Sequence, residues 1–455
     1  MFYHFKIFLR NMRRNYTYSG INIAGLSIGI AASVFIFLWV YHERSFDTHY
    51  PDTDRIYRIT NTNKQGEDTR IFASVSYPFI WACENQIPEI ESTAFFNASP
   101  EIEAVTVNHT VFSVQMGDGV FVNKVWLEMF HSQLLDGSFE AYGAHRFSVA
   151  LTGSAAKKYF GNERAVGQIV RINDADYTVQ AVVKDNPSNS SFRYHVMVST
   201  DVMLSERDKE QWDLLNWRAF VKLRPNADVA QVTQKMNDIY AKNNRVGSEA
   251  GLERLTDMYF SDVYVFGFAH GNARMVSVFA LLGILLLCTA CVNYINLTTA
   301  KATQRAKEVG IRKIVGAKRR TLFLQFIGES FITSLAATIV AFLLVRLFAP
   351  LYQQLIGDIA VSFSSPTLWI ITGIALMFVT VMNGIYPALM LSSFQPVNIL
   401  KGKSLPKIKN SSLRRILVVF QFTLSITLMI SVMVIFQQTR YIQKTDPGFR
   451  KDHNA

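Results

Sequence analysis

Long apolar runs divide the chain into membrane-spanning and polar parts. Five segments each hold about 20 predominantly apolar residues, the length of helix that crosses the hydrocarbon core of a bilayer. These segments are 19–41, 274–297, 324–348, 367–391 and 415–436. No convincing small-residue cleavage site follows the first, so we expect a retained anchor rather than a removed signal peptide. The pattern predicts an α-helical membrane protein with five spans.

A polar region of different character, residues 42–273, separates the first two spans. Alternating apolar positions predict strands, and longer runs with helical spacing predict helices. The predicted strands are Val105–Val114, Asp176–Val183 and Arg218–Leu223, and the predicted helices are Ser154–Phe160 and Val229–Asn243, with Asp228 as N-cap of the last. We therefore expect a large α+β extracytoplasmic domain of one or two lobes between spans one and two.

Lys and Arg alternate between the loops in a way that sets the orientation. Residues 1–18, the loop 301–321 and the linker 401–414 are rich in Lys and Arg, whereas 349–366 contains neither. Basic loops stay in the cytoplasm. This places the N-terminus and both basic loops in the cytoplasm and residues 42–273 outside.

The formal net charge of +11 invites a nucleic-acid interpretation, but its distribution argues against one. Residues 42–272 hold 22 Lys and Arg against 30 Asp and Glu, a balance of −8. The remaining residues hold 24 against 5, a balance of +19. The positive charge therefore lies beside the spans, where attraction to anionic lipid accounts for it. We expect membrane lipid as a partner and no nucleic acid.

The chain offers no recognisable catalytic, cofactor or metal site. Its three cysteines form no ligand set, because the CxxC spacing of Cys288 and Cys291 lies inside an apolar run. The histidines of the polar region are scattered, Ser154 lacks a GxSxG context, and no GxxxxGK[ST] loop is present. A membrane-anchored enzyme would need a clustered catalytic set in 42–273. We therefore expect no enzyme and no cofactor.

Within the spans, small and polar residues indicate helix packing. Gly25 and Gly29 form a GxxxG pattern that lets another helix approach closely, although glycine is also simply common in membrane helices. Asn293 and Asn296 are costly in lipid and should face protein or the interface. We interpret Glu329 as an interfacial carboxylate rather than a buried relay.

The most informative segment is RAKEVGIRKIVGAKRRTLFLQFIGES, residues 305–330. Read as one helix, it puts Arg305, Arg312 and Arg319 on one stripe. Ile311, Ile314 and Val315 fall on the opposite side, and Glu308 precedes Arg312 by four residues. Such a basic amphipathic helix can lie on headgroups or dock into another protein.

Several motifs, in this order along the chain, resemble the MacB/FtsX/LolC-type permease subunits of bacterial ABC transporters. In the polar region they are FDTHYPDTDRIYRIT (46–60), LTGSAAKKYFGNERAVGQIVRIN (151–173) and DYTVQAVVKDNPSNSSF (176–192). In the spans and their loops they are NYINLTT (293–299), the basic segment 305–330 and GIYPALMLSSFQP (384–396). The resemblance runs nearly end to end. It implies a MacB-like periplasmic domain at 42–273 and an FtsX-like three-span permease domain at 274–400.

The resemblance also implies a mechanism. A separate cytoplasmic ABC ATPase would engage a coupling helix in 301–321, and its ATP-driven motion would reach an outer domain acting on an exported or periplasmic substrate or partner. The coupling positions carried over by motif are Arg305, Lys307, Glu308, Val309, Gly310, Arg312, Lys313, Gly316 and Ala317. Charged side chains would contact the ATPase while Ile311 and Ile314 pack, and Gly316 would end the helix. Span-end motif positions are Asn293, Asn296, Tyr386 and Pro387.

The fifth span, 415–436, departs from a four-span plan. Arg414 and Arg415 before it parallel Arg13 and Arg14 before the first span. We therefore expect the start of a second repeat, with 437–455 a truncated outer segment, and either a dimer or fusion to a second permease half. The competing interpretation, a membrane sensor or receptor with an extracytoplasmic ligand-binding domain, would need a cytoplasmic output domain, and the chain offers only short loops there.

Overall fold

The chain divides into two compact units in the computed structural model. The outer domain comprises Tyr41–Val276, and the membrane unit comprises Met1–Val40 with Ser277–Ala455. The structure describes residues 16–65, 68–98, 102–115, 117–131, 133–243, 248–263, 268–300, 309, 311–357, 359, 361–392 and 411–444. The first connection between the units lies within α2 and the second within α9.

Five helices of the described chain are long and apolar enough to cross a membrane, which confirms the predicted spans. They are α2 (Tyr16–Arg44), α9 (Ala273–Ala300), α11 (Arg319–Ile356), α12 (Pro366–Ser392) and α14 (Ser411–Lys444). Each helix is longer than its apolar run, because backbone hydrogen bonding continues into the polar flanks.

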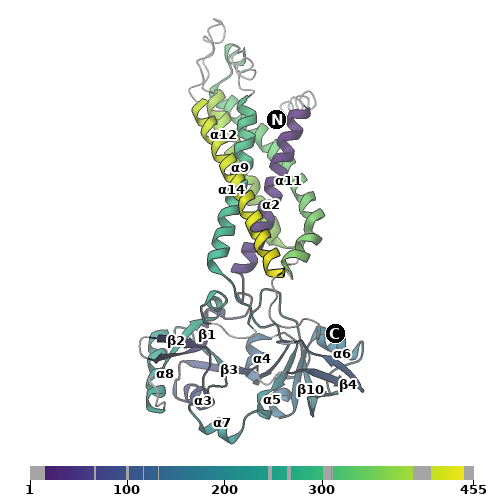
Figure 1. Ribbon diagram of the computed structural model, residues 1–455, viewed down its shortest axis with the longest axis vertical. Helices are drawn as coiled ribbons and strands as arrows, with labels where there is room; N and C mark the ends of the chain where they lie inside the picture. Colours follow the sequence, from purple (N-terminus) through teal and green to yellow (C-terminus); the bar gives the residue numbers. More distant parts are fainter. Residues whose placement is uncertain are drawn as a thin grey trace. The chain divides into compact units, whose positions relative to one another are not determined.

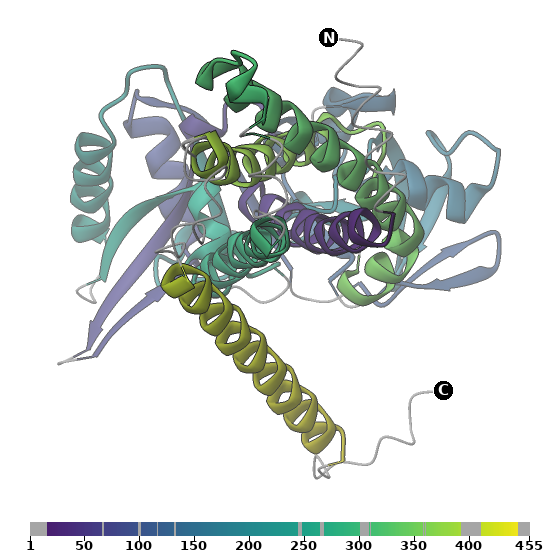
Figure 2. The same ribbon diagram turned by 90° about the horizontal axis from the view of Figure 1, so that it is seen from above.

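Small side chains contribute much of the core of the membrane unit. Ala31 of α2, Ala290 and Cys291 of α9 and Ala337 of α11 are buried and belong to one cluster. Small residues let helix backbones approach in a solvent that is itself apolar. Seen from above in Figure 2, α2, α9, α11 and α12 group together, whereas α14 projects away from them. None of the apolar stretch of α14 that the structure describes is buried.

The outer domain is built on one mixed sheet whose described strands number 13, in the order β13-β1-β12-β3-β6-β11-β8-β10-β9-β4-β5, with β2 on β1 and β7 on β10. Parallel pairs (β8 with β10, β6 with β11) lie among antiparallel ones. The strands are β1 (Ile56–Gln65), β2 (Asp68–Phe72), β3 (Ile90–Asn97), β4 (Ala104–Val107), β5 (Thr110–Ser113), β6 (Gly119–Val122), β7 (Leu134–Gly137), β8 (Ser148–Thr152), β9 (Ile169–Ile172), β10 (Ala175–Val183), β11 (Val196–Ser199), β12 (Arg218–Leu223) and β13 (Ser248–Arg254).

Short helices lie against this sheet (Figure 1). The buried side chains of the domain form three large hydrophobic clusters. The α-helices are α3 (Tyr77–Gln86), α4 (Lys124–Phe130), α5 (Phe139–Ala144), α6 (Gly153–Phe160), α7 (Glu206–Glu210) and α8 (Val229–Asn243). Three 3₁₀ turns are η1 (Thr53–Arg55), η2 (Thr200–Val202) and η3 (Leu255–Phe260). The α+β prediction is therefore confirmed.

Most of the predicted elements match and one does not. The predicted strands at Asp176 and Arg218 are β10 and β12, and the predicted helices are α6 and α8. Asp228 Oδ1 accepts from the Ala230 amide at 2.9 Å, as expected of an N-cap. The single strand predicted over 105–114 is wrong. Asn108 and His109 adopt φ of 47° and 67°, so the chain reverses there into the hairpin β4–β5.

Candidate coupling segment and outer-domain pocket

The coupling segment is residues 301–321, of which 309 and 311–321 are described. Val309 is only 3% exposed and packs in one cluster with Leu322 and Phe326 of α11. Ala317, Phe323 and Ile327 pack partly buried against the same cluster. An apolar contact therefore fixes the segment to the first turns of α11.

The helix of this segment ends at Gly316. The Ala317 amide donates to Arg312 O at 2.9 Å and the Gly316 amide to Lys313 O at 3.0 Å, while Gly316 has φ of 96°. These two bonds form a Schellman motif, which needs a left-handed residue and favours glycine. The prediction of one continuous stripe through Arg312 and Arg319 is therefore wrong, because Arg319 begins α11.

Three aliphatic residues of the segment are exposed. Ile311, Ile314 and Val315 are 64%, 56% and 82% exposed. Val309 makes the buried contact instead, because the turn at Gly316 directs it and Ala317 toward α11. The segment therefore carries an exposed aliphatic surface, which we call the apolar face (Ile311, Ile314 and Val315).

A polar chain joins the segment to α11 beside this contact. Arg312 Nη1 donates to Gln325 Oε1 at 2.7 Å, and Gln325 Nε2 donates to Glu329 Oε1 at 3.0 Å. Glu329 is thus linked through Gln325 to the coupling segment. Sequence reasoning missed Gln325, although its spacing of four residues before Glu329 places both on one helix face.

Basic residues flank the apolar face along the chain. Lys318, Arg319 and Arg320 are exposed, and Arg312 and Lys313 are half-buried. Burial lowers the pKa of Lys313, and the charge of Arg319 lowers it further. A surface of this kind favours an acidic partner. The carried-over positions Arg305, Lys307, Glu308 and Gly310 lie outside the described residues.

The GxxxG pair faces α9. A Cβ on Gly29 would lie 2.6 Å from Ala290 Cβ, and one on Gly25 would lie 3.1 Å from Asn293 Nδ2. Nearby, Ser33 Oγ donates to Gly283 O at 3.0 Å. The two glycines therefore permit the close approach of α2 and α9, and they bring Asn293 against protein.

The other span-end positions carry less information. Asn296 Oδ1 is buried without a hydrogen-bond partner among the described atoms. Tyr386 and Pro387 lie within helix α12, but their side chains are outside the described part of the structure.

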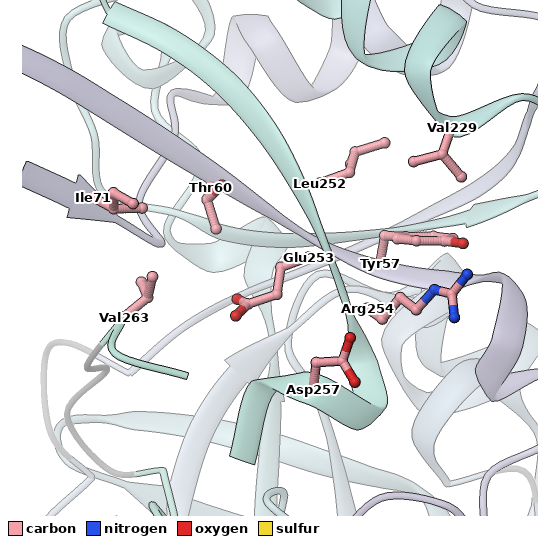
Figure 3. A pocket seen from close by; sticks show the side chains of 9 residues that line it. All are labelled: Tyr57, Thr60, Ile71, Val229, Leu252, Glu253, Arg254, Asp257 and Val263. Atoms are coloured by element: carbon pink, nitrogen blue, oxygen red, sulfur yellow. The ribbon is translucent and has the colours of Figure 1, made fainter. Parts of the chain in front are cut away.

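The outer domain contains a cavity of about 490 Å³ beside β13 and η3. Figure 3 shows its lining: Tyr57, Thr60, Ile71, Val229, Leu252, Glu253, Arg254, Asp257 and Val263. Glu253 accepts from Nε of Arg58 at 3.1 Å, and the Arg58 side chain is only 1% exposed. Burial lowers the pKa of Arg58 and the Glu253 charge opposes this effect. Aliphatic and charged side chains line the cavity together, and the described residues around it form no recognisable catalytic arrangement.

A Ser, His and Asp do meet at the start of α6, without forming a nucleophilic triad. Ser154 Oγ donates directly to Asp185, and His195 Nδ1 lies 3.4 Å from Ser154 Oγ and 3.6 Å from Asp185 Oδ1. A triad uses opposite nitrogens of the imidazole for its two partners. Burial raises the pKa of Asp185, but hydrogen bonds from Ser154 outweigh it and leave that pKa below its usual value. Asp185 caps α6 here. Among the described residues no group of three His, Cys, Asp or Glu side chains could hold a metal ion.

Two family models match the chain in sequence. Residues 19–239 match the MacB-like periplasmic core domain, and residues 279–396 match the FtsX-like permease C-terminal domain. The first covers α2 and most of the outer domain, and the second covers α9, α11 and α12 with the coupling segment.

Curated relatives share this similarity over long stretches. The chain is 22% identical over 405 residues to "Macrolide export ATP-binding/permease protein MacB" of Bdellovibrio bacteriovorus, covering 86% of this chain and 60% of that protein. It is 24% identical over 236 residues to the protein of the same name from Chlorobium luteolum, covering 47% of this chain and 34% of that one. The chain thus spans 60% or less of the length of these relatives.

Solved structures match part of the chain with low similarity. A domain of a putative permease protein from Porphyromonas gingivalis matches with a TM-score of 0.39 and 17% identity, covering 48% of this chain and 95% of that chain. The periplasmic region of MacB from Actinobacillus actinomycetemcomitans matches with a TM-score of 0.32 and 14% identity, covering 42% and 87%. With five apolar helices and these matched domains, the chain is a multi-pass inner-membrane protein that belongs to the MacB/FtsX-type ABC permease family.

Proposed function

We propose that this chain is the permease subunit of an ABC transporter and transmits ATP-driven movement from a separate cytoplasmic ATPase to its outer domain. The outer domain would act on an exported or periplasmic substrate, as in efflux or the handling of lipoproteins or peptides. The curated relatives are named as combined ATP-binding and permease proteins for macrolide export. On this proposal the basic loops face the cytoplasm, and a second permease half, as a dimer or a fusion, completes the unit.

The observation that carries the proposal is the exposed apolar face on a segment fixed to α11. Ile311, Ile314 and Val315 are more than half exposed, while Val309 on the same segment is buried. An aliphatic patch with a basic rim matches a protein interface with an apolar centre and acidic surroundings. The ATPase would bind the apolar face, and the basic residues would orient it.

The length of α11 supports a lever-like role. Ser330–Ile356 alone is about 40 Å long at 1.5 Å per residue, more than the roughly 30 Å of hydrocarbon. Arg319–Glu329 can therefore extend beyond the hydrocarbon as the part of α11 that the coupling segment holds. Movement of the segment would then move the whole helix, because Val309 and Arg312 both contact this extension.

The test combines the full chain in nanodiscs with an ABC ATPase subunit from the same organism. We expect Ile311→Ser with Ile314→Ser to lower permease-stimulated ATP hydrolysis by about tenfold, because interface energy concentrates in central apolar residues. The matched control is Val111→Ser with Ile169→Ser, which removes aliphatic side chains 66% and 62% exposed in the outer domain. The control should leave stimulation unchanged.

Retained stimulation in the Ile311 and Ile314 double variant would refute the proposed interface. If stimulation instead followed the anionic lipid content of the nanodisc and ignored both substitutions, the apolar face would lie on lipid. Loss of stimulation in the outer-domain control as well would show that the effect is not specific to the coupling segment.

A further inference from the structure

One aromatic side chain of the outer domain contacts both chain segments through which that domain continues into membrane helices. Tyr259 of η3 stacks on Phe46, just after α2, with ring centroids 3.6 Å apart and an angle of 9° between the planes. Its hydroxyl donates to Glu43 Oε2 near the end of α2 at 2.8 Å. The backbone carbonyl of Tyr259 accepts a hydrogen bond from the amide of Gly271, two residues before α9, at 2.8 Å. All these residues belong to the outer domain.

Gly271 fits against the face of this ring. A Cβ at Gly271 would lie 2.1 Å from Tyr259 Cε1 and 2.7 Å from Cδ1 and Cζ. Any side chain there would have to displace the ring from Phe46 or lift the chain away from η3. The absence of a side chain thus allows the segment before α9 to contact the same ring that holds the segment after α2.

The element that carries Tyr259 is anchored in the main core of the outer domain. Leu255 and Met258 of η3 are 0% and 3% exposed and belong to the cluster around Phe220. Buried side chains in a close-packed core move together with their neighbours. A movement of the η3 backbone that carries Tyr259 is therefore passed on to this core.

The segment after α2 is also fixed on its other side. Asp47 accepts from the Ser191 amide at 2.7 Å and from Ser191 Oγ at 2.6 Å, and its own amide donates to Asn189 O at 2.9 Å. Asn189 Nδ2 donates in turn to Ser45 O at 2.9 Å. These bonds join the motif that begins at Phe46 to the NPSNSSF motif, 140 residues later in the chain.

We propose that Tyr259 is a positioning residue that joins the end of α2 to the start of α9, so that the two segments and η3 move together. This inference rests on the proposed function, in which movement must pass from membrane helices to the outer domain. The inference specifies the contact through which the movements of α2 and α9 are coupled. Its parts are the Tyr259 ring, Phe46, Glu43 and Gly271.

Hydrogen exchange of the full chain in nanodiscs, without any ATPase, tests the connection itself. We expect Tyr259→Leu to speed amide exchange about tenfold in both 41–50 and 268–276, because it removes the ring contact and the hydroxyl donor together. Tyr259→Phe and Glu43→Gln should show a smaller effect that also appears in both segments. Gly271→Ala should loosen both segments while retaining the Tyr259 hydroxyl.

The matched control is Tyr57→Phe, which removes a hydroxyl hydrogen bond to Asp54 O elsewhere in the outer domain. It should change neither segment. Unchanged exchange in 194–199 of the core would show that each variant is folded; if Tyr259→Leu fails this criterion, Tyr259→Phe and Gly271→Ala decide. Faster exchange in only one of the two segments would overturn the inference, since the ring would then not join them.

A second arm adds the ATPase and ATP. The inference predicts that ATP alters exchange in both segments together in the unsubstituted chain, and that Tyr259→Leu confines the change to one. Equal ATP responses with and without the ring would overturn it. The segments could respond together to Tyr259→Leu without the ATPase while ATP changes the exchange of neither segment. That result would refute the proposed function but support the role of Tyr259 in joining the two segments.

Discussion

In both units a glycine lets two backbone segments lie close together, but different interactions keep the segments in place. In the outer domain, Gly137 ends β7 with φ of 87°, and a Cβ there would lie 2.1 Å from Gln180 O of the neighbouring strand. In the membrane unit, Gly29 sits in a regular helix and would meet the Ala290 side chain at 2.6 Å. Ladder hydrogen bonds fix the first contact, whereas two helices can shift apart to relieve the second. The outer domain should therefore be the more rigid unit.

The largest expected effect is Gly137→Ala. The new Cβ meets a carbonyl oxygen held by the Ser138 amide at 3.0 Å, and the left-handed φ adds strain. We expect the free energy of unfolding of the outer domain to fall by about 4 kcal/mol. The control is Gly167→Ala, where φ is 88° but no atom lies within 4 Å, and where about 1 kcal/mol is expected. Thermal unfolding of the full chain measures both, and equal losses would contradict the rigid-sheet argument.

Burial of charge gives the next largest effect. Asp47 is fully buried, and burial raises its pKa to about 6 in spite of the Ser191 hydrogen bonds. Between pH 4 and 6 the unfolded chain loses this proton while the folded domain keeps it, so stability falls as pH rises. The loss is up to about 3 kcal/mol. Asn tolerates the φ of 57° at this position, so Asp47→Asn should abolish this slope.

The quantity to measure is the difference in the free energy of unfolding between the unsubstituted chain and Asp47→Asn. Burial lowers the pKa values of His49 and His131 to about 4, which gives an opposite slope in both chains and cancels between them. Denaturant unfolding at pH 4, 5 and 6 measures the difference. A constant difference across this range would mean that Asp47 does not titrate there.

The sequence predicted the elements whose signals are local. Val229–Asn243 and Arg218–Leu223 match α8 and β12, because one shows helical spacing after a capping Asp and the other a buried apolar run. The hairpin at Asn108 was missed because its turn residues lie inside one apolar run. The sheet order was also out of reach, since it depends on pairings such as Tyr57 with Arg254 that no local pattern encodes.

The candidate site was predictable in position but not in orientation. The basic composition marked the segment 301–321 in the sequence, and Gly316 within it predicted the helix end that the structure shows. Treating the segment as one helix with α11 missed the change of direction at Gly316, so the buried contact of Val309 with α11 was not predicted. Tyr259 had no sequence signal of its own, since its partners Phe46 and Gly271 are remote along the chain.

Gly29→Ala gives a smaller effect than its counterpart in the sheet. The added methyl meets the Ala290 side chain, and α2 can move by a fraction of an ångström to accommodate it. We expect a loss of about 1–2 kcal/mol in thermal unfolding of the membrane unit. Gly20→Ala on the same helix meets no atom within 4 Å and should cost nothing. A loss as large as that of Gly137→Ala would show that α2 and α9 are held as firmly as the sheet.

The smallest expected effect is the difference between two Arg–Gln hydrogen bonds, one in each unit. Arg312 donates to Gln325 across two helices at 2.7 Å, whereas Arg207 donates to Gln211 within α7 and its flank at 2.9 Å. The first pair also continues to Glu329, and its loss would free the coupling segment from α11 on one side. Double-mutant cycles with Arg→Met and Gln→Leu should give a coupling energy of about 0.5–1 kcal/mol for Arg312 and Gln325. The exposed pair in α7 should give roughly 0.3 kcal/mol, as expected of solvated neighbours on a helix. If the two energies are equal, Val309 and its apolar contacts alone hold the segment, and the Arg312–Gln325–Glu329 chain contributes nothing to transmission.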